Sequence, residues 1–382
     1  NFGNFTIVKI QFLDLQKQQE RIKSSVEKRL SSILNHGAYI MGPEVFELEE
    51  KLADYCNVKH VISCSSGTDA LLIPLMAWGV GPGDAVFTTP FTYVATAEVI
   101  ALLGATPVFV DVYDSTFNID CEKLELAIQN TISDEKLIPK AIIPVDLFGV
   151  PARYRVIEEI AKKYDLKIIE DAAQSFGAKI GNTKVGNFGD VAATSFYPAK
   201  PLGCYGDGGA IFTNDDDLAA VMKSIRIHGG GSDKYDNVCV GINGRLDTLQ
   251  AAVLLEKLAI FPDEVVERNK VAQYYSDNMP GGFIVPHVPK NYLSSWAQYS
   301  ILAESKQKRD SAIELLESHE IPAMIYYRIP LHLQKVFNYL EYQPGAFPVA
   351  EKISETILSI PMHPYLEKCE QDEILEILHA IK

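Results

Sequence analysis

The sequence predicts an α/β protein in which a large, mostly parallel sheet is followed by a smaller α+β domain. Short β-branched, apolar segments alternate with stretches of helical periodicity up to about Gly229. This alternation is typical of a parallel sheet that helices cover on both faces, and the continuous apolar character of the segments fits strands buried on both sides. Beyond Gly229 the pattern changes to a long helix and then to mixed short elements. We therefore expect two domains, residues 1–255 and residues 256–382.

Two helices are expected before the first strand. Helical spacing of apolar residues predicts the first over residues 15–35. A Gly-Pro break follows, and the second helix starts at Pro43, a residue that the first helical turn tolerates. The residues on which these two helices depend are Ile22, Val26, Leu30 and Ile33 in the first, and Val45, Leu48, Leu52 and Tyr55 in the second.

The alternating region is expected to contain six strands. The rest of the chain is expected to contain mostly helices and one short strand. The strands are expected at residues 60–63, 85–88, 107–112, 140–145, 167–170 and 191–196. Helices between them are expected at residues 69–78, 94–103 and 155–163. A glycine run at residues 229–231 predicts a loop. The last third is expected to hold a long helix at 248–277, a strand at 298–302, and helices at 309–318 and 370–380.

Composition narrows the functional classes. The chain has 382 residues and a formal net charge of −15, with no basic run that would attract a phosphate backbone, so nucleic acid is not an expected partner. No uncharged apolar stretch reaches the roughly 18 residues of a membrane span. The six cysteines include no Cys-x-x-Cys pair, which indicates reduced thiols and no metal site. Since residues 1–10 also lack the pattern of a signal peptide, we expect a cytoplasmic protein.

The first chemical signal is Ser-Ser-Gly-Thr-Asp-Ala at residues 65–70, between an expected strand and helix. Gly67 permits a sharp turn, and the N–H groups of the first helical turn favour an anion. This pattern predicts a phosphate-binding turn. The alternative is a simple capped helix, with Ser66 or Thr68 as the cap.

The second signal is an acid at the end of an apolar strand. Asp171 follows Ile168 and Ile169 and is expected at the carboxyl edge of the parallel sheet, where α/β proteins bind ligands. A carboxylate buried there needs a cationic partner, and a protonated pyridine nitrogen is one. Gln174 is expected to face the same pocket. The alternative is that Asp171 caps a following helix.

The third signal is Lys200, which stands between two prolines in a glycine-rich turn. Most lysines lie on solvated helix faces, but this turn aims the side chain and its apolar flanks can desolvate it. Desolvation lowers the pKa of a lysine and makes its amine nucleophilic. Ser195, five residues earlier, is placed to offer a hydroxyl to the same phosphate as Thr68.

The fourth signal is Arg245, at the start of the long expected helix. Its guanidinium can meet a carboxylate or a phosphate with two parallel hydrogen bonds. The alternative is a surface ion pair with Asp247.

Together these motifs resemble the sugar aminotransferases of the DegT/DnrJ/EryC1/StrS family, which depend on pyridoxal 5′-phosphate (PLP) and have the aspartate aminotransferase fold, fold type I. The most specific stretch is Ser-Phe-Tyr-Pro-Ala-Lys-Pro-Leu-Gly at residues 195–203. Gly-Thr-Asp-Ala at 67–70 and Glu-Asp-Ala-Ala-Gln at 170–174 support it in the same order. The resemblance spans nearly the whole chain, from residues 12–15 through 42–45 to 360–364.

The resemblance implies a role for each matching residue. Lys200 matches the lysine that links covalently to the cofactor, and Asp171 matches the acid that keeps the pyridine nitrogen protonated. Gln174 matches the contact to the phenolic oxygen of the ring. Tyr93 matches the aromatic residue that stacks on the ring, with Phe91 as the alternative. The matches to the phosphate ligands are Gly67, Thr68, Ser195 and Asn243, the last of which reaches the phosphate from the neighbouring subunit in the family and so implies a homodimer with shared active sites.

The resemblance also suggests substrates. L-Glutamate is the family's usual amino donor. The sequences at residues 201–210 and 361–365 resemble those of the subgroup that aminates C3 of UDP-2-acetamido-2-deoxy-3-oxo-glucuronate for bacterial surface polysaccharide. Arg245 is then the candidate partner of the uronate carboxylate. Tyr326 and Arg328 depart from the family pattern, in a segment where Tyr327 matches it. The expected substrate contacts are Arg245, Tyr326, Tyr327 and His363, with His332 as a further histidine that is more often structural.

Four alternatives stay open at this point. Within the family, these are amination at C4 and amination of a dTDP-linked sugar. From another class, a nicotinamide oxidoreductase is disfavoured because no Gly-x-Gly-x-x-Gly follows the first expected strand. A PLP-binding regulator without turnover is disfavoured by the net charge of −15 and by the lack of a DNA-binding helix-turn-helix signature.

Overall fold

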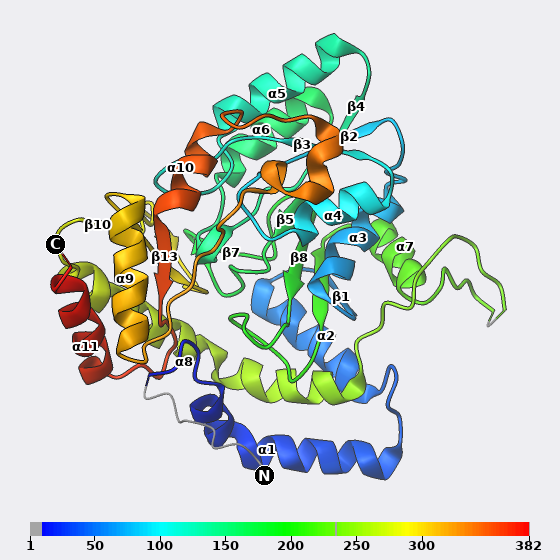
Figure 1. The fold of residues 1–382 in the computed structure, drawn as a ribbon. Coiled ribbons are helices and arrows are strands. Elements are labelled where there is room, and N and C mark those ends of the chain that lie inside the picture. Colours follow the sequence, from blue (N-terminus) through cyan, green and yellow to red (C-terminus); the bar gives the residue numbers. More distant parts are fainter. Residues whose placement is uncertain (1–9, 234, 382) are drawn as a thin grey trace.

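A seven-stranded sheet forms the centre of the protein, as a computed structural model that describes residues 10–233 and 235–381 shows (Figure 1). The strand order is β1-β9-β8-β5-β4-β2-β3. These strands are β1 His60–Cys64, β2 Asp84–Thr88, β3 Thr106–Phe109, β4 Ile138–Ile142, β5 Lys167–Asp171, β8 Val191–Ser195 and β9 Gly209–Thr213. The pairs β2–β3, β2–β4, β4–β5 and β5–β8 are parallel, which confirms the expected mostly parallel sheet.

Strand β9 is the exception, and the sequence pattern did not predict it. It runs antiparallel to both of its neighbours, β8 and β1. The chain passes from β8 to β9 through the turn that carries Lys200, with no helix between them. A parallel return needs a crossover of a dozen or more residues, usually helical, so the short connection here gives an antiparallel strand.

Helices cover both faces of this sheet (Figure 1). One face packs against α3, α4 and α7. The other face packs against α5 and α6 at one end and against α2 and α8 at the other. The bounds of the helices so far are α2 Pro43–Cys56, α3 Gly67–Ala77, α4 Ala95–Leu102, α5 Cys121–Asp134, α6 Tyr154–Tyr164, α7 Asp216–Arg226 and α8 Thr248–Asn278. The N-terminal helix α1 Leu15–His36 lies along α8.

A second, smaller core lies beside the large sheet. Its antiparallel sheet has the order β10-β12-β13, and α9 and α11 pack on it together with the last turns of α8. The elements are β10 Phe283–Ile284, β12 Tyr299–Ala303, β13 Ile357–Ile360, α9 Lys306–Ser318 and α11 Lys368–His379. A small three-stranded sheet of order β11-β6-β7 links the regions, with β6 Lys179–Ile180, β7 Thr183–Lys184 and β11 Tyr292–Leu293.

The two cores do not correspond to two consecutive segments of the chain. The expected boundary between residues 255 and 256 falls inside the continuous helix α8. Part of the C-terminal region also returns to the large sheet, where residues of η2 Leu331–Leu333, η3 Lys335–Leu340 and α10 Pro348–Thr356 join an aromatic core with Phe91 and Phe148 of the first region. This returning segment passes close to the carboxyl edge of the large sheet.

Three further expectations concern a membrane span, a metal site and a signal peptide. No helix among the described residues is long and apolar enough to cross a membrane. The same residues hold no cluster of three or more His, Cys, Asp or Glu side chains arranged for a metal ion. The expectation about a signal peptide falls almost entirely on residues 1–9, which lie outside the described residues.

Candidate active site

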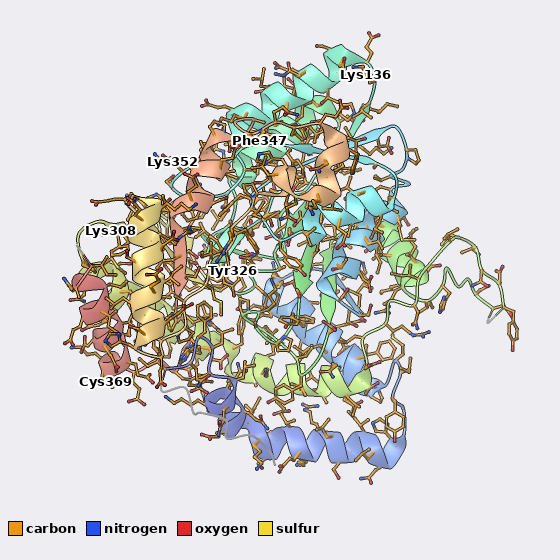
Figure 2. All side chains as sticks on the ribbon, viewed as in Figure 1. Lys136, Lys308, Tyr326, Phe347, Lys352 and Cys369 are labelled. Atoms are coloured by element: carbon orange, nitrogen blue, oxygen red, sulfur yellow. The ribbon has the colours of Figure 1, made fainter. Side chains whose placement is uncertain are left out.

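Most of the expected site residues line one cavity at the carboxyl edge of the large sheet. The cavity has a volume of about 420 Å³, within the usual range for small-molecule sites. The ends of β5 and β8 and the start of α3 open onto it, and the returning segment around Tyr326 closes its far side. Figure 2 shows Tyr326 near the centre of the molecule. The expected residues that line it are Gly67, Thr68, Tyr93, Asp171, Gln174, Ser195, Lys200, Tyr326 and Tyr327.

The start of α3 forms the expected anion-binding turn. Ser66 caps the helix, and its Oγ accepts a hydrogen bond of 3.0 Å from the N–H of Asp69. Gly67 packs so closely on Ser195 that an added Cβ would lie 2.5 Å from the Ser195 Cβ, so a larger residue would displace the hydroxyl. Capping by Ser66 leaves the N-terminal end of the helix, at Gly67 and Thr68, facing the cavity. The turn is therefore a capped helix whose free N-terminal end also suits a phosphate.

Asp171 is the last residue of β5, and its carboxylate is buried in the cavity wall, 4% exposed. The Thr96 hydroxyl donates to its Oδ2 at 2.8 Å, and the Ala173 N–H donates to its Oδ1 at 3.2 Å. Burial raises the pKa of Asp171, while these two hydrogen bonds and the nearby Lys200 oppose that shift. No helix follows Asp171 directly, so it does not serve as a helix cap. The carboxylate is placed to face a cationic ligand.

Lys200 reaches the same cavity from the turn after β8. The turn is closed by a hydrogen bond of 2.8 Å from the Lys200 N–H to the carbonyl of Tyr197. Desolvation lowers the pKa of the Lys200 amine, and the carboxylate of Asp171 acts in the opposite direction. A larger share of the amine is then uncharged than for a lysine in water. The neutral amine is the form that attacks an aldehyde and accepts a proton.

Gln174 is held rigidly between two elements. Its Oε1 accepts a hydrogen bond of 2.9 Å from the N–H of Phe148, and its Nε2 donates to the hydroxyl of Tyr327 at 3.1 Å. Of the two aromatic candidates for ring stacking, Tyr93 lines the cavity with an exposed side chain. Phe91 is fully buried in the aromatic core instead. The geometry therefore favours Tyr93.

These features fit PLP. The α3 N-terminus suits its phosphate, the buried Asp171 suits a protonated ring nitrogen, and Lys200 suits its aldehyde. The near-contact between Gly67 and Ser195 brings the two groups expected to bind the phosphate to one point. No other cationic side chain of the described chain lines the cavity besides Lys200.

The comparisons with known proteins decide the family. Residues 20–379 match the DegT/DnrJ/EryC1/StrS aminotransferase family. The chain is a member of this family.

Relatives of established name match over almost their whole length. The UDP-2-acetamido-2-deoxy-3-oxo-D-glucuronate aminotransferase of Pseudomonas aeruginosa is 48% identical over 94% of this chain and 96% of its own. A pleiotropic regulatory protein of Geobacillus stearothermophilus is 43% identical over 96% of this chain and 97% of its own.

Solved structures agree with this assignment. A DegT/DnrJ/EryC1/StrS aminotransferase from Brucella abortus is 52% identical, with a TM-score of 0.94 over 97% of this chain and 99% of its own. The NtdA protein of Bacillus subtilis with bound cofactor PMP is 30% identical, with a TM-score of 0.89 over 99% of this chain and 86% of its own. The protein is a PLP-dependent aminotransferase of fold type I, as the motifs predicted.

Several expected site residues of this DegT-family aminotransferase do not line the cavity. Asn243 and Arg245 flank Gly244, whose carbonyl accepts a hydrogen bond of 3.0 Å from the N–H of Ser65, beside the phosphate seat. Asn243 is exposed, and Arg245 is half-buried with no ion pair to any described residue, including Asp247.

The histidines and Arg328 lie elsewhere. His363 is buried in the small core, where burial and the neighbouring Arg268 lower its pKa to about 4. His332 is buried and bonds through Nε2 to Glu351 at 3.0 Å, which makes it a structural residue. Arg328 is exposed outside the cavity. None of the three lines the cavity among the described residues.

Thr96 is a site residue that the motifs did not reveal. It lies in the first turn of α4, is 1% exposed, and donates its hydroxyl to Asp171. A threonine after Val94 and Ala95 gives no signal in the sequence, because its role depends on α4 packing beside the end of β5. Its hydrogen bond favours the ionised carboxylate against the effect of burial and orients it.

We expect Thr96→Val to weaken the enzyme without unfolding it. Valine keeps the shape but removes a hydrogen bond to a charged group, which is worth about 1.5–3 kcal/mol. The dissociation constant of PLP should rise by roughly 10-fold and kcat should fall. Fluorescence titration of the apoprotein checks the first effect, with Thr92→Val as the control because its hydroxyl contacts Thr96 and not Asp171. Equal PLP affinity in wild type and Thr96→Val would contradict this role.

Two further buried acids, Asp146 and Glu170, lie close to Asp171. Asp146 accepts hydrogen bonds of 2.8 Å from the Ala152 N–H, the Tyr154 hydroxyl and the Ser175 hydroxyl. Glu170 accepts through Oε2 from the N–H groups of Gly186 and Phe188. Its Oε1 is buried without a donor and lies against Asp146.

Among the described residues these two carboxyl groups have no cation beside them, so ionisation of both at once is unfavourable. Burial raises the pKa of Asp146 to about 7, and burial together with the charge of Asp146 raises the pKa of Glu170 well above its usual value. Asp146 precedes η1 Leu147–Gly149, whose Phe148 N–H holds Gln174, and it also binds the neighbouring Ser175. Protonation within this acid pair therefore bears on the loop that orients Gln174.

Stability should fall as pH rises through neutrality. Because the folded pKa values are raised, the folded state binds more protons than the unfolded state between about pH 4 and pH 7, and this stabilisation is lost as pH rises through the folded values. For each additional proton that the folded state binds, the free energy of unfolding falls by about 1.4 kcal/mol per pH unit. Glu170→Gln, which is neutral at every pH, should flatten the dependence.

Urea unfolding at pH 5, 6, 7 and 8 measures this effect. Glu158→Gln is the matched control, because Glu158 is an exposed acid on α6. It should leave the slope unchanged. The same slope of stability against pH in Glu170→Gln and wild type would show that the pair holds no extra proton.

Proposed function

We propose that this aminotransferase moves an amino group from L-glutamate to the C3 keto group of UDP-2-acetamido-2-deoxy-3-oxo-glucuronate, in the synthesis of bacterial surface polysaccharide. The observation that carries amino transfer is the meeting of Lys200, Asp171 and the α3 N-terminus in one cavity. The choice of sugar is supported by the 48% identity to the Pseudomonas aeruginosa enzyme of that name.

The side chains divide the work between binding and proton transfer. Bound PLP supplies an electron sink that stabilises negative charge at the carbon losing its proton. Asp171 keeps the ring nitrogen protonated, and the α3 N-terminus with Ser195 holds the phosphate. The Lys200 amine would move a proton between the two carbons that exchange it, a role worth about 10²–10⁴-fold in rate.

We also propose a homodimer in which each subunit completes the other's site. Tyr93 and Tyr197 line the cavity and are 57% and 54% exposed, which is high for aromatic residues at a catalytic mouth. Further exposed apolar side chains lie on α1, on the connection from α1 to α2, on α2 and at the start of α8: Leu34, Tyr39, Ile40, Phe46 and Leu249. An apolar surface of this kind is typical of a protein interface. It would place Asn243 at the partner's phosphate.

Arg245 is our candidate for the uronate carboxylate, from the partner subunit. Among the described residues, Lys200 is the only lysine or arginine that lines the cavity, and it is proposed to carry out the proton transfer. A sugar acid needs a second cation, and Arg245 has no ion pair in the described chain. Tyr326 and Tyr327 line the cavity and are proposed as further sugar contacts. His363 is not proposed, since it lies in the small core.

The proposed compartment is the cytoplasm. All six cysteines are free, and Cys56, Cys64, Cys121 and Cys204 are buried. Free thiols agree with a reducing compartment.

The test is amino transfer from glutamate to a set of keto nucleotide sugars. Purified holoenzyme is incubated with L-glutamate and with UDP-linked or dTDP-linked 3-keto or 4-keto sugars, and the product is identified by mass spectrometry and NMR. We expect the 3-keto uronate to be converted most efficiently, with 2-oxoglutarate formed in equal amount. Arg245→Gln should lose the preference for the uronate over the same sugar with a hydroxymethyl group. Efficient conversion of a 4-keto or dTDP-linked sugar alone would replace the proposed substrate.

A further inference from the structure

Two amide side chains line the catalytic cavity, and they differ in their hydrogen bonding. Gln174 uses both its oxygen and its nitrogen in hydrogen bonds to Phe148 and Tyr327. Gln298, immediately before β12, is half-buried and has no hydrogen bond to any described residue. Its Oε1 is fully buried without a donor. A buried acceptor without a partner is costly, so Gln298 calls for a partner that the protein chain does not supply.

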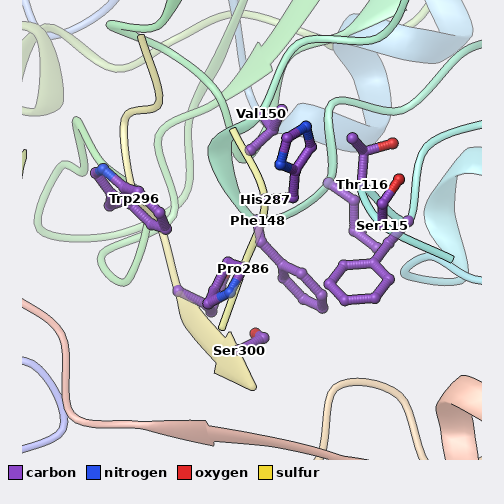
Figure 3. A pocket seen from close by; sticks show the side chains of 11 residues that line it. Ser115, Thr116, Phe148, Val150, Pro286, His287, Trp296 and Ser300 are labelled. Carbon is purple, nitrogen blue, oxygen red and sulfur yellow. The ribbon is translucent and has the colours of Figure 1, made fainter. Parts of the chain in front are cut away.

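Gln298 also lines a second, much smaller cavity where the two cores meet. This cavity lies between Thr116 and Phe148 on one side and Pro286, Trp296 and Ser300 on the other (Figure 3). Its volume of about 10 Å³ accommodates roughly one water molecule. Gln298 is thus a wall shared by the small cavity and the catalytic cavity.

Thr116 supplies the complementary group in the small cavity. Its Oγ1 is also fully buried and without a hydrogen-bond partner. The Ser300 hydroxyl in the same wall is already bonded to Ser359 at 2.8 Å. A water that donates to the Gln298 Oε1 and bonds to the Thr116 hydroxyl satisfies both unpaired atoms at once. Such a water fixes the plane of the amide across the two cores.

With its oxygen anchored on that side, the amide nitrogen is free for the catalytic cavity. The Gln298 Nε2 is not among the fully buried unpaired atoms, and nothing in the described chain accepts from it. The charged side chains lining the catalytic cavity are Asp171, Asp207 and Lys200. A carboxylate that enters beside two acids needs neutral donors, and an amide N–H group is a suitable one.

We propose that Gln298 determines substrate specificity by donating its Nε2 N–H to a carboxylate oxygen of the substrate, and that Thr116 positions it through a bound water. This inference rests on the proposed function, in which both the donor amino acid and the sugar acid carry a carboxylate. The two half-reactions identify which of the two sources Gln298 contacts.

The variants are Gln298→Glu, Gln298→Leu and Thr116→Val, with Ser115→Ala as the control. The Gln298→Glu change preserves the shape of the side chain but removes both N–H donors and repels a carboxylate. The Gln298→Leu change removes the donors without adding charge. Ser115 lines the same small cavity with an exposed side chain. Each holoenzyme is mixed rapidly with L-glutamate, and each aminated enzyme with the keto uronate or its hydroxymethyl analogue, while the cofactor absorbance is followed.

We expect Gln298→Glu to raise the substrate concentration for half-maximal rate by about 10- to 100-fold, the loss typical of a hydrogen bond to a charged group. Gln298→Leu should give a smaller increase, and Thr116→Val about a 3-fold increase in the same half-reaction. The maximal rate should change less than the half-maximal concentration. An effect with glutamate alone assigns the amino-acid carboxylate, and an effect with the uronate but not its analogue assigns the sugar carboxylate.

Two results would overturn the proposal. One is an unchanged half-maximal concentration in both half-reactions for folded Gln298→Glu and Gln298→Leu. The other is a Thr116→Val enzyme that behaves like Ser115→Ala, which would remove the water-mediated anchor. If wild type does not aminate any keto sugar, the proposed function fails, whereas the glutamate half-reaction still tests Gln298.

Discussion

Replacing Lys200 by alanine is expected to lower the rate of amino transfer by at least about 10⁴-fold, because one change removes both the nucleophile and the proton carrier. Lys200 is the lysine of the described chain that lines the cavity with Asp171. PLP should still bind, since the α3 N-terminus and Asp171 remain. Steady-state assay of 2-oxoglutarate formation and absorbance of the dialysed protein measure the two effects.

Lys257 provides a demanding control for this result. It is 1% exposed on α8, and burial lowers its pKa to about 8, so a lowered pKa alone does not distinguish it from Lys200. Its Nζ lies 4.6 Å from the centre of the Tyr205 ring, outside the catalytic cavity. Lys257→Met should therefore retain turnover. Substantial activity in Lys200→Ala, or its loss in Lys257→Met despite correct folding, would reverse the assignment.

The second large effect is expected at Asp171. Asp171→Asn should lower kcat by about 10²–10³-fold, because an amide cannot hold the ring nitrogen in its protonated form, and breaking a buried ion pair costs about 3–5 kcal/mol. The apoprotein should respond in the opposite way. Burial of the carboxylate is unfavourable, and Thr96, Ala173 and Lys200 offset it only in part, so the asparagine variant should unfold at an equal or higher temperature when PLP is absent.

Thermal unfolding with and without PLP separates these effects. In wild type the cofactor should raise the unfolding temperature strongly, and in Asp171→Asn only weakly. Asp207→Asn is the comparison, because Asp207 lines the same cavity but is exposed and so loses less on neutralisation. Equal cofactor stabilisation in Asp171→Asn and wild type would show that Asp171 does not pair with the ring.

The fold was predictable where a single segment carries its own pattern. Ile22, Val26 and Ile33 fix the buried face of α1, and the apolar residues of β5 place Asp171 at the sheet edge. Strand β9 was missed because its direction follows from the short turn after β8 rather than from its composition. The return of α10 to the large sheet was missed for the same reason, since it depends on contacts between distant segments.

The same limit applies to the site. Motifs identified Gly67, Asp171 and Lys200, because glycine turns, acids after strands and constrained lysines have recognisable local patterns. Thr96 and Gln298 have no such pattern, and only packing brings them to the cavity. The expected roles of Asn243 and Arg245 stay predictions, because a single chain leaves both outside the cavity.

The most direct test of the central claim is reduction of the holoenzyme with borohydride, which makes the link between lysine and cofactor permanent. The digested protein is then mapped by mass spectrometry. The account predicts that the added mass of the reduced cofactor lies on the peptide containing Lys200 and on no other. A modified Lys257, or a protein that binds PLP and gains no mass at any lysine, would contradict it.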